Sequence, residues 1–147
     1  MKTQEIKINR ALLRNAERHA RSTYPEECCG FLFGKITNGT SEVILTERVN
    51  NRKAENRQRR YLITPEQFME AEEIAERTGY ELIGVYHSHP DHPAIPSQFD
   101  LDHALPGFLY LITSVRRKIE TDSRLWELLP DRGAFKELKI NTQNKEN

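Results

Sequence analysis

The 147-residue sequence has little cysteine and no long hydrophobic run. Its two cysteines, Cys28 and Cys29, are adjacent, a spacing at which a disulfide closes no loop, so a disulfide scaffold is excluded and a reducing compartment is expected. No run of about 18 apolar residues is present, which excludes a transmembrane helix. The N-terminal segment MKTQEIKINR also lacks the apolar core of a signal peptide. We therefore expect a cytoplasmic protein without a membrane partner.

Net charge is absent as well. The 22 basic and 22 acidic side chains balance, so the sequence gives no electrostatic indication of nucleic-acid binding. A local exception is the basic cluster NRKAENRQRR, which has five Arg or Lys between Arg52 and Arg60. This cluster is either a solvated loop or a docking surface for an acidic partner, and the sequence leaves both interpretations open. A composition of 37% hydrophobic and 30% charged residues is typical of a globular domain.

Apolar periodicity predicts a single α/β domain of mixed α+β type. Alternating patterns and short apolar runs predict strands near residues 6–8, 28–34, 43–49, 82–87, 108–115, 125–129 and 135–140. Helical spacing predicts helices over residues 10–22, 64–79 and 97–104, the second beginning at an N-cap Thr64 and ending at Gly79. The order β-α-β-β-α-β-α-β-β-β indicates a mixed sheet flanked by helices over residues 1–140, followed by a polar tail at 141–147.

The segment HSHPDHPAIPSQFD contains a set of metal-binding residue types. Side chains two apart on a strand share a face, so His87 and His89 can point at one cation. A carboxylate returned by the following segment, Asp100, completes three protein ligands. A fourth tetrahedral position left to water is what distinguishes a catalytic zinc site from a structural one. The pattern predicts one catalytic Zn²⁺ per chain; the alternative is a group of surface histidines in a proline-rich loop.

The remaining histidines and the cysteines do not fit this ligand pattern. We expect His92 near the mouth of the site and His103 to be an ordinary packed or exposed residue. One residue of any adjacent pair on a strand faces inward, so Cys29 is expected in the core and Cys28 near the site, neither with a catalytic role.

A water molecule that attacks an amide needs a base, and a carboxylate outside the ligand set would serve. Glu26 and Glu27 are the candidates, because they precede the apolar strand CGFLFG next to the predicted zinc strand. Considered alone, the two residues are better explained as exposed glutamates in a turn after Pro25.

Two blocks of sequence together resemble the JAMM/MPN+ (Mov34/MPN/PAD-1) zinc metallopeptidases. The pattern E-x-C-G-x-L-x-G begins at Glu27, and the motifs GVYHSHP and PSQFD follow in the family's order. The resemblance implies a cytidine-deaminase-like JAMM/MPN fold and a zinc ion bound by His87, His89 and Asp100. It also implies that Glu27 is the general acid/base and that Ser97 donates a hydrogen bond to the oxyanion.

The runs at residues 79–86 and 105–112, with Trp126, further resemble small bacterial members of the Mec+ (CysO-cysteine peptidase-like) type. That resemblance implies hydrolysis of the amide bond after the C-terminal Gly-Gly of a ubiquitin-like or sulfur-carrier protein. The alternative is a non-catalytic MPN scaffold that binds such a partner, although scaffolds have lost ligands that this sequence keeps. A zinc nucleobase deaminase would need H-x-E and P-C-x-x-C, which are absent. Neither the carrier, the leaving group nor the oligomeric state follows from the sequence.

Overall fold

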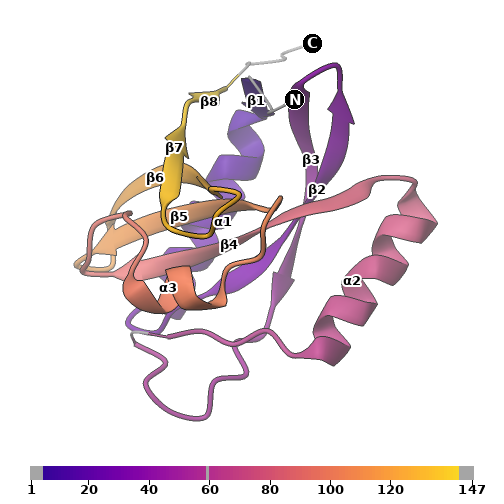
Figure 1. Cartoon of the computed structure of the whole chain (residues 1–147). Coiled ribbons are helices and arrows are strands. Elements are labelled where there is room, and N and C mark those ends of the chain that lie inside the picture. Colours follow the sequence, from indigo (N-terminus) through magenta and orange to yellow (C-terminus); the bar gives the residue numbers. More distant parts are fainter. Residues whose placement is uncertain (1–4, 59, 143–147) are drawn as a thin grey trace.

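A computed structural model describes residues 5–58 and 60–142 (Figure 1). Its centre is a mixed eight-stranded sheet in the order β7-β6-β5-β4-β2-β3-β1-β8. The strands are β1 (Glu5–Ile8), β2 (Cys29–Thr37), β3 (Thr40–Val49), β4 (Glu81–Pro90), β5 (Leu109–Arg116), β6 (Glu120–Leu128), β7 (Phe135–Leu138) and β8 (Ile140–Asn141). The helices are α1 (Arg10–Thr23), α2 (Pro65–Thr78) and α3 (Gln98–His103). The predicted architecture, a mixed sheet flanked by helices, is confirmed.

Alternating side chains divide the core between the two faces of the sheet. Leu32 and Tyr86 pack in one cluster with Ala16 and Ala20 of α1. Their strand neighbours Phe31, Phe33 and Val85 pack on the other face, with Ala71 and Ala75 of α2 and with Ile63 and Ala104. Helix α1 therefore covers one face, while α2 and the chain around α3 cover the opposite face.

Helix α2 begins and ends where local signals place it. The Thr64 hydroxyl accepts a hydrogen bond from the Gln67 N–H at 3.2 Å, and the Gln67 side chain accepts one from the Thr64 N–H at 2.8 Å. This reciprocal capping box satisfies two of the free N–H groups of the first turn. Gly79 has φ 81°, the left-handed conformation that ends helices and that glycine adopts at least cost. The predicted bounds of this helix are confirmed.

The end of the chain differs from the prediction of one strand over 135–140. Residues Phe135–Leu138 form β7 and pair with β6, whereas Ile140–Asn141 form β8 and pair in parallel with β1 at the opposite edge of the sheet. Asn141 therefore lies in a strand, and the predicted polar tail beyond Thr142 falls outside the described residues. No helix in the described ranges is long and apolar enough to cross a membrane.

Candidate metal centre

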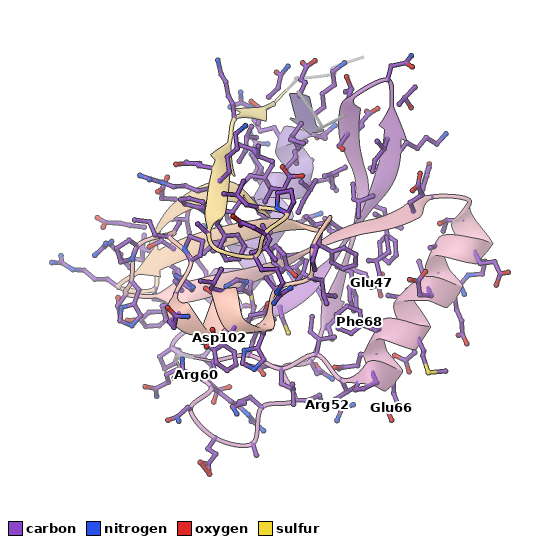
Figure 2. All side chains as sticks on the ribbon, viewed as in Figure 1. Glu47, Arg52, Arg60, Glu66, Phe68 and Asp102 are labelled. Carbon is purple, nitrogen blue, oxygen red and sulfur yellow. The ribbon has the colours of Figure 1, made fainter. Side chains whose placement is uncertain are left out.

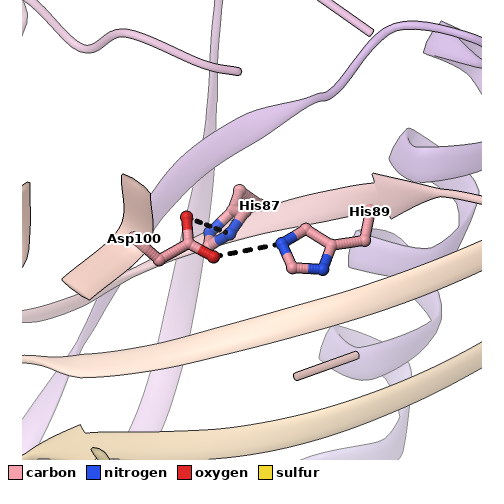
Figure 3. Close-up of side chains that lie close together, drawn as sticks. All are labelled: His87, His89 and Asp100. Atoms are coloured by element: carbon pink, nitrogen blue, oxygen red, sulfur yellow. Dashed lines mark hydrogen bonds and ion pairs between the residues drawn. The ribbon is translucent and has the colours of Figure 1, made fainter. Parts of the chain in front are cut away.

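Strand β4 and helix α3 bring three predicted ligands together (Figure 3). His87 and His89 lie two residues apart on β4 and share a face, and Asp100 lies in the first turn of α3. The Nε2 atoms of His87 and His89 are 3.2 and 3.1 Å from the two carboxylate oxygens of Asp100. All three side chains are buried.

The geometry of these side chains fits a zinc ion. Both ring nitrogens of His87 are buried without a hydrogen-bond partner, although Nε2 faces Asp100. Three ligand atoms, one from each residue, lie within 4.8 Å of one another. Bonds of about 2.0–2.1 Å at a tetrahedral angle separate two ligand atoms by roughly 3.3 Å, close to the distances seen. A cation between them would give the unpaired Nε2 atom of His87 a partner.

Hydrogen bonds outside the ligand set fix the orientation of His89 and Asp100. The Nδ1 atom of His89 lies 2.8 Å from the Pro93 carbonyl oxygen, which directs Nε2 at the site when Nδ1 carries the proton. The Ser97 N–H donates to Asp100 Oδ2 at 2.9 Å, and the Asp100 N–H donates to Ser97 Oγ at 3.1 Å. The reciprocal capping box that begins α3 therefore also fixes the position of the Asp100 carboxylate.

The protonation states suit metal binding. Burial lowers the pKa of His87, outweighing the opposite effect of Asp100, so its imidazole stays neutral. Burial would raise the pKa of Asp100, but the neighbouring imidazoles His87 and His89 hold it well below its ordinary value. A neutral imidazole and an ionised carboxylate are the forms that bind zinc, so metal binding needs little proton release from His87 and Asp100.

The two candidate glutamates are separated by the structure. Glu26 is exposed, whereas Glu27 is 4% exposed. Burial and, to a smaller extent, repulsion from Asp100 raise the pKa of Glu27 to about 9, against the opposite effect of Arg60. Glu27 is therefore close enough to Asp100 to sense its charge, and Cys29, two residues further along, is in register with His87 on the neighbouring strand.

Cys29 lies in the core as predicted, but the prediction that Cys28 lies near the site is wrong. Cys28 packs on the α1 face, and its N–H donates to Ser88 Oγ at 2.8 Å. Cys29 is the residue on the face of the metal centre, in register with His87. The reversal arises because alternation along β2 places Cys29 with Phe31. Burial raises the pKa of both thiols, to about 12 for Cys28, so they stay protonated.

The glycine of the E-x-C-G pattern has a steric role. A Cβ atom on Gly30 would lie 2.1 Å from Cε2 of Tyr86 and 2.6 Å from the Glu47 carbonyl oxygen. The Tyr86 ring thus packs directly across the backbone of β2, on the opposite face from His87. Only glycine allows this close approach, which holds the two strands of the site together.

Two residues of the site were missed by sequence reasoning. The ring of Tyr61 stacks on His87 with centroids 4.4 Å apart and planes at 21°. The Asn51 side chain donates to the carbonyls of Glu27 and Arg60 and accepts from the N–H groups of Lys53 and Leu62. Segment 50–63, which contains the basic cluster, is thereby attached to the chain that carries Glu27. No local pattern in this polar segment predicts such contacts.

The other histidines lie outside the ligand set. His103 is exposed, with its ring stacked on Phe99 at a centroid distance of 4.1 Å, as expected of an ordinary residue. His92 is also exposed, and its place at the mouth of the site stays a prediction.

Fold and site together define a buried group of three residues that could hold a metal ion, and comparison with known proteins identifies the family. The chain belongs to the prokaryotic homologs of the JAB domain, which it matches over residues 9–129. The resemblance to JAMM proteins is therefore confirmed.

Individual relatives agree with this assignment. The chain is 36% identical over 105 residues to the desampylase of Haloferax volcanii, covering 71% of this chain and 73% of that protein. It is 30% identical over 129 residues to the Lys-63-specific deubiquitinase BRCC36 of Camponotus floridanus, covering 76% and 49%. A solution structure of a Salinibacter ruber protein is similar, with a TM-score of 0.74, 41% identity and coverage of 95% and 93%.

Proposed function

We propose that this protein is a zinc-dependent hydrolase that cleaves the amide bond after the C-terminal Gly-Gly of a ubiquitin-like or sulfur-carrier protein. The observation that carries the proposal is the buried set His87, His89 and Asp100, with unpaired nitrogens on His87, next to the buried carboxyl of Glu27. The relatives named desampylase and deubiquitinase support hydrolysis of conjugates of ubiquitin-like proteins.

Different residues of the site have different roles in amide hydrolysis. A bound zinc ion would polarise the scissile carbonyl and acidify the attacking water. Glu27 takes the proton from that water and delivers it to the leaving amine. Burial and Asp100 raise its pKa to about 9, and the charge of a bound zinc ion would lower that pKa and favour the carboxylate form that accepts the proton. Ser97 Oγ already accepts from the Asp100 N–H, so its own proton is free to be donated to the oxyanion. Pro93 and Ser97 hold the ligands in place through their backbone groups.

A diglycine tail suits a site built from buried groups. Without side chains, an extended Gly-Gly end can approach ligands that are themselves nearly inaccessible. Carrier identity and the leaving group, whether an amino acid, a peptide or a lysine side chain, depend on surfaces around this centre.

A direct test incubates the zinc-loaded protein with ubiquitin-like carriers extended beyond Gly-Gly by cysteine, by a short peptide or by an isopeptide-linked lysine. Mass spectrometry should show a single cut after the second glycine in at least one of them. Asp100→Asn should abolish the cut, whereas Asp102→Asn, an exposed carboxylate on the same helix, should retain it. A zinc-loaded protein that cleaves none of them would instead fit the non-catalytic scaffold.

A further inference from the structure

An apolar cavity of about 250 Å³ lies beside the metal centre. It opens between segment 50–63, α2 and α3, and its walls include Tyr61, Leu62, Ile63, Phe68, Phe99 and Leu105. Figure 2 shows Phe68 between α2 and the sheet, and Arg60 next to α3. Small-molecule and cofactor pockets have volumes of roughly 300–1,000 Å³, so this smaller cavity suits a single large side chain.

The cavity shares its walls with the metal centre. Tyr61 lines the cavity and stacks on His87, and Phe99 immediately precedes the ligand Asp100. The Phe99 ring is held by the Arg60 guanidinium, 4.5 Å from its centroid, and by the stacked ring of His103. An occupant of the cavity would therefore lie one aromatic ring away from a zinc ligand, against walls that are fixed by their own contacts.

The polar lining residues Lys53, Tyr61, His103 and Tyr110 contribute no buried side-chain nitrogen or oxygen that lacks a hydrogen-bond partner. The Tyr110 hydroxyl already accepts a hydrogen bond from the Leu105 N–H at 2.6 Å. Leu62 and Leu105 are 42% and 44% exposed, and they extend the apolar lining outward to the surface. A cavity that continues into exposed apolar side chains forms a contiguous apolar surface of the kind that binding sites present.

We propose that this cavity is a specificity pocket for a bulky apolar side chain, of leucine size, at the third position before the scissile bond of the carrier. The inference rests on the proposed function. Because Gly-Gly offers no side chains, the third residue from the bond is the first that could fill the cavity. Two extended residues span roughly 6.6 Å, enough to pass the Tyr61 ring, whose centroid lies 4.4 Å from that of His87.

The size of the effect follows from the burial of one apolar side chain. Removing a leucine side chain from water into such a cavity should improve affinity by about 10- to 150-fold over alanine. Aspartate at the same position should bind more weakly than leucine, because it buries less apolar surface and its carboxylate must be desolvated against a largely apolar wall in which only Lys53 and His103 carry basic groups.

The test uses the zinc-loaded Glu27→Gln protein, so that peptides are bound without turnover, and isothermal titration calorimetry. The probes are N-acetylated Ala-Ala-Xaa-Gly-Gly-Yaa amides, with Leu, Ala or Asp at Xaa and Leu or Ala at Yaa. Leucine at Xaa should bind at least tenfold tighter than alanine. Leu105→Asp and Leu62→Asp, both at the exposed mouth, should each reduce that preference to within twofold. Met69→Asp, on α2 and 65% exposed, is the matched control and should keep it.

Equal affinities for leucine and alanine, a preference that follows Yaa, a preference that survives both mouth variants, or no binding of any peptide would overturn the pocket assignment. The proposed function is read out separately, as zinc content and as cleavage of the same peptides by the unsubstituted protein. Cleavage without a preference at Xaa would contradict the pocket alone. Absence of both zinc and cleavage would contradict the proposed function.

Discussion

Zinc binding to His87, His89 and Asp100 should stabilise the folded protein by an amount that can be calculated in advance. A ligand that binds only the folded state at 100 times its dissociation constant adds about 2.7 kcal/mol to the free energy of unfolding. Unfolding entropy is about 2.1 cal/mol/K per residue near 60 °C, and the chain has 147 residues. The product of these two numbers, the entropy of unfolding of the whole chain, is about 0.3 kcal/mol/K. Dividing the stabilisation of about 2.7 kcal/mol by this entropy predicts that zinc raises the Tm by about 9 °C.

The assay is differential scanning calorimetry of chelator-treated protein with and without added zinc. Asp100→Asn keeps an oxygen that can accept the Ser97 N–H hydrogen bond but removes the anionic ligand. A 100-fold loss of zinc affinity would leave a shift of only about 1 °C at the same zinc concentration. Asp102→Asn, exposed on the same helix, should keep the full shift. The assignment of the ligands is refuted if the unsubstituted protein shows no shift or if Asp100→Asn shows the full one.

Two further variants test other groups. Burial lowers the pKa of His19 to about 4, and its Nδ1 lies 2.7 Å from the Tyr86 hydroxyl; the stability from this neutral imidazole is complete above pH 6.5 and is lost as pH falls toward 4. The free energy of unfolding of His19→Asn, measured with urea, should therefore change by about 3 kcal/mol less between these two pH values than that of the unsubstituted protein. An equal change in both proteins would contradict the low pKa of His19. Ser97→Ala should lose about 1 kcal/mol through its N-cap and lower kcat by at least about 100-fold with little change in KM; an unchanged kcat would limit Ser97 to holding Asp100.

The close approach of the proposed ligands His87, His89 and Asp100 was predictable because it depends on local geometry. The spacing H-x-H places two imidazoles on one face of any strand. Ser97 and Asp100 are separated as in a capping box, so the same four residues that begin α3 also direct the carboxylate. Thr64 and Gly79 bound α2 by equally local rules. These features depend on neighbouring residues, and the sequence is sufficient to predict them.

What the sequence did not predict depends on contacts between distant segments. The last strand divides because Ile140 pairs with Ile6 of β1, at the other end of the strand order from β7, a partner that apolar alternation cannot specify. Tyr61 and Asn51 lie in a polar segment without periodicity, and their roles arise only from packing against His87 and Glu27. The surroundings of the proposed metal centre therefore depend on tertiary contacts, whereas its proposed ligands follow from local sequence.

The role of Glu27 as the general acid/base is tested most directly by comparing two adjacent glutamates. Glu27→Gln removes the buried carboxylate, and Glu26→Gln changes its exposed neighbour. Zinc content by elemental analysis and kcat on a carrier extended beyond Gly-Gly are measured on the same preparations. Glu27→Gln should hold one zinc per chain and lose at least about 100-fold in kcat, while Glu26→Gln should stay within twofold of the unsubstituted protein. A zinc-loaded Glu27→Gln protein with full activity would contradict the central claim.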